Sequence, residues 1–182
     1  MVLNPKIFNG IKKRFSDMEV ITPREFAQTI LDVINDYEAV FSQPPFSDWG
    51  LLAYKDLDLN EYPINHSVFH KNYLGFSRYI DSRLDQMISI PFKHRSSFAM
   101  LLRSHLEDLL YVELKAHTCP NCHSDGGGEV ILVKYSNHDA LAFFCQSCNH
   151  SNFLEDEPLG HLETMIPPTT SELIEYGYLT SL

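Results

Sequence analysis

The amino-acid sequence predicts an α+β protein, in which an N-terminal helical bundle is followed by a C-terminal β-hairpin module and a short helical tail. Apolar residues recur at helical spacing as far as about residue 116. Two Cys-x-x-Cys pairs then flank two segments rich in β-branched and large apolar residues, as β-strands are. With 182 residues and 44% hydrophobic content, the chain can bury one good core, or one core plus a small module.

The first two predicted helices begin at recognisable N-terminal signals. A proline follows Asn4, so we expect a helix from there to about Phe15. Thr22 and Glu25 have the spacing of a capping box, with a proline at the first helical position between them. Apolar residues then recur three and four apart, so the second helix should run to about Phe41.

The middle of the chain is predicted to be irregular at first and then helical. Residues 43–65 contain several prolines, and only one short turn is expected, near residues 49–54. Asn65 can cap a long amphipathic helix that Pro91 ends. A leucine-rich helix over residues 96–116 then leads into the first cysteine pair without a flexible linker. We therefore predict a helical domain that ends at residue 116.

All four cysteines of the chain lie in two pairs of metal-ligand spacing. Cys119 and Cys122 form the first pair, and Cys145 and Cys148 form the second. A Cys-x-x-Cys pair brings two sulfurs close enough to share one metal ion, and two pairs supply the four thiolates of a tetrahedral structural zinc site. The sequence therefore predicts one structural Zn²⁺ held by these four residues.

The segment between the pairs is predicted to be a hairpin. Residues 129–135 should form one strand, residues 136–139 the turn, and residues 140–144 the returning strand, which places Cys145 beside the first pair. This arrangement over residues 117–152 resembles the zinc-ribbon family.

The resemblance implies a zinc-ribbon domain at residues 117–157, followed by a tail at residues 158–182 that packs back on the rest. The tail has a signal for a short capped helix after two prolines. Zinc ribbons often have glycine after the second cysteine of each pair, where this chain has His123 and Asn149. Both residue types tolerate positive φ better than most, so the turn is still allowed.

Other uses of the cysteines remain as alternatives. Disulfides need an oxidising compartment, and the first residues lack the apolar core of a signal peptide, so we expect reduced thiols and a cytoplasmic protein. A thioredoxin-like pair should open a helix, whereas Cys122 is followed by a glycine-rich loop. Nearby His117, His123 and His150 could replace a ligand, although four cysteines make this unnecessary. No apolar run approaches the length of a membrane span.

Negative charge is concentrated at the C-terminal end. Fourteen Lys and Arg stand against twenty-four Asp and Glu, a net charge of −10. Residues 116–182 hold nine of the acidic residues and only one basic residue, Lys134, a net charge of −8. Because phosphate contacts require Lys and Arg, this distribution opposes direct nucleic-acid binding through the ribbon and favours a basic protein partner.

The acidic residues of this region are the candidate partner-binding residues. A solvated surface that only keeps the protein in solution is the alternative interpretation. The candidates are Asp139, Glu155, Asp156, Glu157, Glu163, Glu172 and Glu175.

Catalytic arrangements are not evident. His66 and His70 have the spacing of HExxH histidines, but the glutamate after the first histidine is absent. His105 lies among the leucines of its helix, which indicates a core histidine rather than a general base. We expect no enzyme.

Three functional hypotheses remain open. In size, acidity and lack of catalytic motif, the chain resembles the small immunity proteins and antitoxins with which bacteria neutralise nuclease toxins. This resemblance is one of overall type and rests on no motif. A toxin that binds nucleic acid is basic, so an acidic inhibitor gains association rate from complementary charge. The alternatives are a zinc-ribbon regulator that acts with nucleic-acid machinery and an enzyme whose site the sequence pattern does not reveal. The zinc module could also only stabilise the fold.

Overall fold

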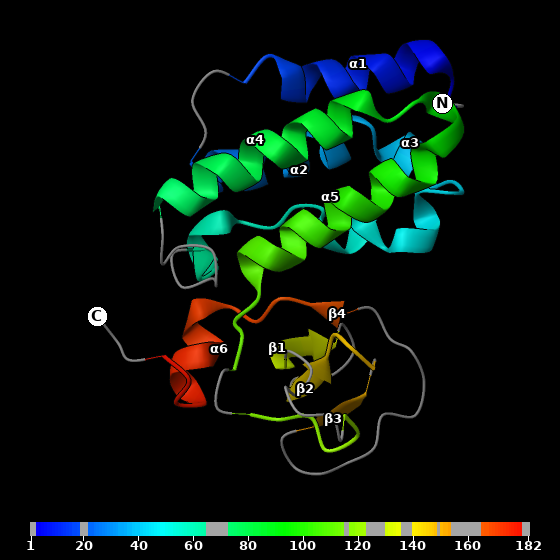
Figure 1. Cartoon of the computed structure of the whole chain (residues 1–182). Helices are drawn as coiled ribbons and strands as arrows, with labels where there is room; N and C mark the ends of the chain where they lie inside the picture. The colour runs from blue at the N-terminus through cyan, green and yellow to red at the C-terminus, as the bar shows by residue number, and fades with distance from the viewer. Residues whose placement is uncertain are drawn as a thin grey trace. The chain divides into compact units, whose positions relative to one another are not determined.

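The computed structural model describes two compact units of mixed helix-and-sheet class (Figure 1). The described residues are 3–18, 22–64, 73–114, 117–122, 130–135, 140–148, 150–153 and 165–179. One unit comprises residues 1–59 and 69–109, and the other comprises residues 60–68 and 110–182. Helices build the first unit, and an antiparallel sheet organises the second, in agreement with the predicted succession of a helical part and a hairpin.

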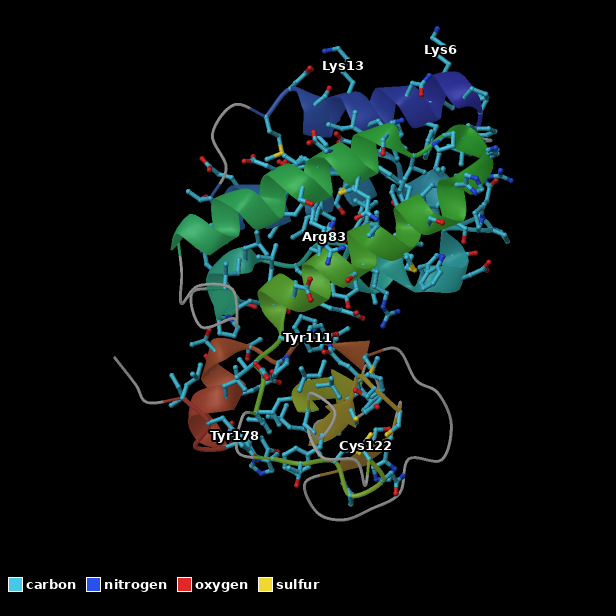
Figure 2. The ribbon with its side chains drawn as sticks, in the orientation of Figure 1. Lys6, Lys13, Arg83, Tyr111, Cys122 and Tyr178 are labelled. Carbon is cyan, nitrogen blue, oxygen red and sulfur yellow. The ribbon has the colours of Figure 1, made fainter. Side chains whose placement is uncertain are left out.

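Helix α1 (Pro5–Ser16) begins where the sequence predicts. The Asn4 side chain accepts hydrogen bonds from the backbone N–H groups of Lys6 and Ile7, each at 3.0 Å. These bonds satisfy two of the N–H groups that a helix leaves without partners at its start. The apolar face of α1 is buried, while Lys6 and Lys13 point away from the helix on its exposed face (Figure 2).

Helix α2 (Pro23–Asp36) begins with the predicted capping box. The Thr22 hydroxyl accepts from the Glu25 N–H at 3.2 Å, and the Glu25 carboxylate accepts from the Thr22 N–H at 2.7 Å. The expected continuous helix is interrupted, because Tyr37 at φ −115° and ψ 27° separates α2 from the short helix α3 (Glu38–Phe41). The Asn and Asp residues just before this point compete with the backbone for hydrogen bonds, which weakens a helix.

The segment after α3 is more regular than predicted. The sequence indicated one short turn near residues 49–54, whereas the structure has three 3-10 helices, at Ser47–Trp49, Leu51–Tyr54 and Leu59–Glu61. Gly50, at φ 61°, joins the first two in a left-handed conformation that glycine adopts without strain.

Two longer helices complete the first unit. Helix α4 (Tyr73–Ser89) runs beside α1, and its predicted cap, Asn65, lies outside the described residues. Pro91 follows the end of α4, as predicted. Helix α5 (Arg95–Leu110) is shorter than the predicted helix to Ala116, because the residues after Leu110 instead pair with the sheet of the second unit.

Aromatic rings from three helices meet in the core of the first unit. Phe98 of α5 lies edge-on to Phe8 and Phe15 of α1, with ring centroids 5.2 and 6.1 Å apart. Phe15 also meets Phe26 of α2 edge-on, at 6.4 Å. All four side chains are buried, and edge-to-face contacts of this kind add to the free energy gained from burial.

His105 of α5 is a core histidine, as predicted. Its ring is fully buried and lies 5.4 Å from the Phe26 ring. Burial, together with the positive charge of Arg83, lowers the pKa of His105 to about 3. The imidazole is therefore neutral near pH 7 and packs as part of the apolar core.

The second unit is built around an antiparallel sheet with strand order β3-β2-β1-β4. Strands β1 (Val130–Tyr135) and β2 (Leu141–Cys145) form the predicted hairpin, and its turn, residues 136–139, lies outside the described residues. Strands β3 (Ser151–Phe153) and β4 (Met165–Ile166) were not predicted from the sequence.

A further segment pairs with the outer edge of β1, next to β4. The Leu114 N–H donates to the Val130 carbonyl at 2.8 Å, and the Leu132 N–H donates to the Val112 carbonyl at 3.1 Å. The β-branched and aromatic residues of this segment suit an extended backbone better than the end of a helix. These bonds explain why α5 ends at Leu110.

One face of the hairpin carries two clusters of side chains. Because alternate residues of a strand share a face, Val130 and Leu132 lie on the same side as their partners Cys145 and Phe143. Val130 and Cys145 belong to a cluster with Cys119, against which Cys122 also packs, and Leu132 belongs to a cluster with Leu173 of the tail. The partly buried Phe143 ring packs against both clusters.

Helix α6 (Thr170–Glu175) is the predicted capped helix of the tail. The Thr169 hydroxyl accepts from the Glu172 N–H at 3.2 Å, and the Glu172 carboxylate accepts from the Thr169 N–H at 2.8 Å. Leu173 is fully buried in the cluster on the hairpin. The tail helix thus packs on the hairpin through Leu173.

Candidate metal centre

All four cysteines of the chain meet at one end of the hairpin. Cys119 and Cys122 lie in the turn before β1, Cys145 is the last residue of β2, and Cys148 lies in the next turn. Their four sulfurs lie within 4.8 Å of one another, an arrangement that no other His, Cys, Asp or Glu cluster in the described part of the chain reproduces. The four residues could hold one metal ion, as predicted.

The distances between the sulfurs suit a metal ion better than disulfides. The Cys119 sulfur is 3.5 Å from that of Cys148, and the Cys122 sulfur is 3.6 Å from that of Cys145. A tetrahedron with metal–sulfur bonds of about 2.3 Å has edges of about 3.8 Å. A disulfide needs sulfurs about 2.05 Å apart, and all four cysteines are free.

Backbone hydrogen bonds shape both turns that carry the cysteines. In the first turn the Cys122 N–H donates to the Cys119 carbonyl at 3.2 Å. In the second the Cys145 N–H donates to the His150 carbonyl at 2.8 Å, which returns the chain alongside β2 as β3. The local backbone thus positions both sulfurs of each pair toward the same point.

Two of the cysteine thiols have pKa values shifted in opposite directions. Side-chain hydrogen bonds, first from Cys148 and then from Cys145, raise the pKa of Cys122 to about 12. Burial opposes ionisation of Cys145, but the backbone N–H groups of Cys148 and Ser147 donate to its sulfur and lower its pKa to about 7. Sulfurs this close cannot all be thiolates unless a cation lies among them, and a bound metal ion supplies that charge.

A side-chain hydrogen bond ties the two turns together. The Asn121 amide nitrogen lies 2.7 Å from Nδ1 of His150. Because an amide NH₂ group only donates, Nδ1 accepts and the ring hydrogen is on Nε2. That Nε2 atom is shielded from solvent, and among the described residues it meets no hydrogen-bond partner. Asn121 was not singled out from the sequence, because neither its type nor its place in the pair signals this contact.

The three histidines near the cysteines have different surroundings. His150 joins the turns through Asn121. His117 stacks on the Phe143 ring, with ring centroids 5.0 Å apart and an interplanar angle of 29°. His123 lies outside the described residues, as do Asn149 and the two histidines of the HExxH-like spacing, His66 and His70.

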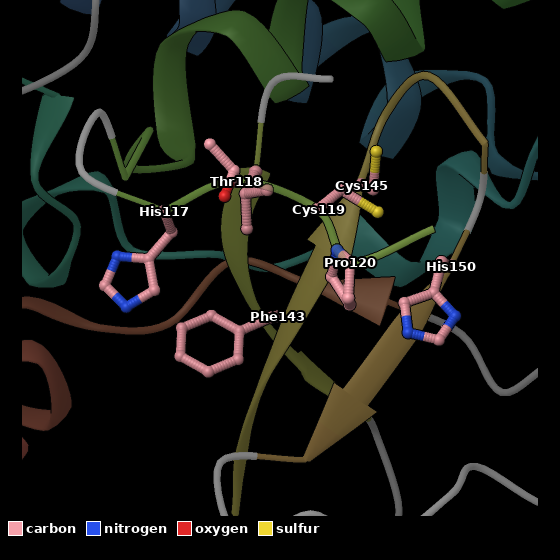
Figure 3. Close-up of a pocket in the computed structure, with 8 residues that line it drawn as sticks. His117, Thr118, Cys119, Pro120, Phe143, Cys145 and His150 are labelled. Atoms are coloured by element: carbon pink, nitrogen blue, oxygen red, sulfur yellow. The ribbon is translucent and has the colours of Figure 1, made fainter. Parts of the chain in front are cut away.

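A pocket of about 310 Å³ opens directly beside the sulfurs (Figure 3). Its buried lining includes two of the cysteines, and its exposed lining includes a histidine, a threonine and a proline. The full lining is His117, Thr118, Cys119, Pro120, Val130, Phe143, Cys145 and His150. The sequence held one signal for it, since Phe143 stands two residues before Cys145 in a strand and so shares its face.

Only two of the candidate partner-binding residues lie in the described part of the chain. Glu172 is half-buried, pairs with the Lys134 ammonium and closes the cap of α6, so the chain itself already engages its carboxylate. Glu175 is exposed on α6. The other candidates, Asp139, Glu155, Asp156, Glu157 and Glu163, lie outside the described residues.

Comparison of the chain with known protein families, with curated protein sequences and with solved structures found no match. None of the helices in the described part of the chain combines the length and the apolar character that a membrane span requires.

Proposed function

We propose that the four cysteines hold one zinc ion and that this zinc is structural, as in the zinc ribbons that residues 117–152 resemble. The support is a set of four free thiols at near-tetrahedral separations, carried by two Cys-x-x-Cys turns. Thiolates prefer Zn²⁺ to the harder cations Mg²⁺ and Ca²⁺. Four protein ligands also leave no open position for substrate or water, so the proposed role is stabilisation of the hairpin rather than catalysis.

We further propose that the chain is a protein-binding protein whose partner is basic, in the manner of an immunity protein or antitoxin that neutralises a nuclease-like toxin. The observation that carries this proposal is the charge of residues 116–182. Residues 116–182 have a net charge of −8, and their only basic residue, Lys134, is paired with Glu172. A field of one sign steers an oppositely charged partner toward the molecule before contact.

The experiment is an association-rate measurement with the protein encoded by the neighbouring gene, at several ionic strengths. Reversal of Glu155, Asp156 and Glu157 to lysine should slow association and flatten its dependence on salt, because the steering charge is removed. Folding and zinc content should stay unchanged.

A matched control keeps the change in net charge and moves its place. Asp48, Asp81 and Asp85 are exposed acidic residues of the helical unit, and their reversal to lysine changes the net charge equally. If this variant slows association as much as the first, the total charge of the chain controls the rate, and the position of the acidic segment at residues 155–157 does not. If neither variant changes the rate, electrostatic capture is not part of the mechanism.

The alternative of a regulator that acts on nucleic acid is tested on the same protein. Because phosphate contacts require cations and residues 116–182 have one basic residue against nine acidic ones, the isolated chain should not shift duplex DNA or RNA in a gel at physiological salt. A salt-sensitive shift at micromolar protein would favour the regulator over the inhibitor.

A further inference from the structure

The pocket beside the cysteines is lined by two cysteines and by the rings of His117 and Phe143. A structural zinc does not require an open pocket at this place. We propose that it binds an arginine side chain of the basic partner. This inference rests on the proposed function, and it names the chemical group through which the partner is recognised.

The first support is the negative charge of the cysteine sulfurs that line the pocket. Cys119 and Cys145 line it, and both belong to the four-thiolate cluster. Four thiolates around one Zn²⁺ carry a net charge of −2, so their sulfurs accept hydrogen bonds from cationic donors. Within residues 116–182 the one basic residue, Lys134, is paired with Glu172.

The second support is a pair of aromatic rings in the lining of the pocket. The rings of His117 and Phe143 are stacked at 5.0 Å, and both line the pocket. Figure 3 shows the two rings side by side, with Pro120 on the other side of Phe143 from His117. A planar cation gains cation–π attraction and stacking on such a surface while its N–H groups reach sulfur acceptors.

These two features favour arginine over other groups. The guanidinium is planar and weakly hydrated, so it can stack on rings and donate at its edge, whereas the lysine ammonium is compact and strongly hydrated. A carboxylate would be repelled by the negatively charged sulfurs. A volume of about 310 Å³ lies at the lower end of ligand pockets, which are roughly 300–1,000 Å³, and so suits a single side chain. His117, Thr118 and Pro120 are exposed, so a side chain can enter from solvent.

The test is a nuclear magnetic resonance titration of the full-length, zinc-loaded chain. The probe is the peptide acetyl-Gly-Arg-Gly-amide, and two further peptides replace arginine by lysine or by citrulline, which keeps the planar shape without the charge. We expect saturable shifts in the resonances of His117 and Phe143 with the arginine peptide. The lysine peptide should bind several-fold more weakly, and the citrulline peptide should cause no saturable shift.

Two variants and one matched control assign the binding to the pocket. Phe143→Leu should weaken binding of the arginine peptide by about two- to fivefold, the range that an exposed cation–π contact supplies. His117→Ser, at an exposed position, should weaken it similarly without disturbing the core. Phe144→Leu removes a ring from the same strand but on the opposite face, and should leave binding unchanged. Zinc content is measured in every variant.

The inference is overturned if the citrulline peptide binds as tightly as the arginine peptide, if no peptide causes saturable shifts, or if Phe144→Leu weakens binding as much as Phe143→Leu. The arginine site and the proposed inhibitor function can be disproved separately. A double variant, His117→Ser with Phe143→Leu, that still binds the basic neighbouring protein with unchanged affinity overturns the arginine site alone. Arginine-peptide binding without any complex between the two proteins overturns the proposed inhibitor and leaves the site standing.

Discussion

The helical unit and the sheet unit exclude water from their interiors by different means. The helical unit buries a continuous set of phenylalanines and aliphatic residues, with edge-to-face contacts between rings from α1, α2 and α5. One face of the hairpin in the sheet unit carries two small clusters, and one of them contains Cys119 and Cys145. Small units with little apolar surface commonly need a metal or another cross-link to stay folded. We therefore expect different treatments to unfold the two units.

Removal of the proposed zinc should give the largest effect, and it should fall on the sheet unit. Structural zinc contributes roughly 10–16 kcal/mol in small zinc-finger peptides. We expect Cys145→Ser to lose stoichiometric zinc and to expose the hairpin to limited proteolysis, while most of the helical circular dichroism remains. Ser147→Ala, at an exposed neighbouring position that supplies no sulfur, should keep both zinc and fold. Complete loss of the helical signal in Cys145→Ser would show that the units unfold together.

Acid should give the next largest loss of stability, and this loss should fall on the helical unit. The pKa of His105 is about 3 in the folded chain and about 6.5 in an unfolded one. Between these values the unfolded chain binds an extra proton, so the free energy of unfolding falls as the pH drops from about 6.5 toward 3. The loss amounts to roughly 5 kcal/mol by the end of that range.

His105→Gln isolates this contribution. The variant should show a flatter dependence of the unfolding free energy on pH, when urea unfolding is followed by the helical signal. Zinc release, which also responds to acid because thiolates protonate, is recorded separately with a metal indicator. Equal slopes for the variant and the wild-type protein would mean that His105 does not couple the helical unit to pH.

Truncation of the tail's buried leucine tests the second cluster of the sheet unit. Leu173 is fully buried against Leu132 and Leu141, so Leu173→Ala should cost about 2–5 kcal/mol. Hydrogen exchange should accelerate in β1 and β2 and stay unchanged in α5. The neighbouring Ile174→Ala, at an exposed position, should change stability by less than about 0.5 kcal/mol. Acceleration in α5 as well would contradict the separate behaviour of the units.

The smallest effects come from matching caps in the two units. Thr22 and Thr169 each accept a hydrogen bond from the N–H three residues on, in the same capping-box geometry. Replacement of either threonine by alanine should cost about 1 kcal/mol. Exchange should increase in α2 for Thr22→Ala and in α6 for Thr169→Ala, each without change in the other helix. Equal responses of both helices to either substitution would again indicate one cooperative unit.

The sequence revealed those features that local residue chemistry determines. The helix starts at Asn4 and Thr22, a short capped helix in the tail, the hairpin strands and the meeting of the four cysteines each follow from a short pattern with one main structural solution. The early end of α5 and the strands β3 and β4 follow from hydrogen bonds to β1 or β2 that join residues distant in the sequence. A two- or three-residue strand has no periodicity of its own, so only its pairing defines it.

The candidate site divides in the same way. Spacing alone identified the four sulfurs, whereas the pocket depends on how His117 stacks on Phe143 after the strand and the first turn have come together. The Asn121 link to His150 likewise joins two turns that are separate in the sequence. Contacts of this kind arise from tertiary packing and leave no signal in residue type or spacing.

The two edges of the sheet determine how readily a second chain can add a strand to it. Residues 112–114 cover the first part of the outer edge of β1, and β4 covers the last part. The opposite edge of the sheet, β3, is three residues long. Long uncovered strand edges are templates on which a second chain can add a strand, and short or covered edges prevent such growth. In the described residues, therefore, the sheet offers little backbone for fibril-like stacking.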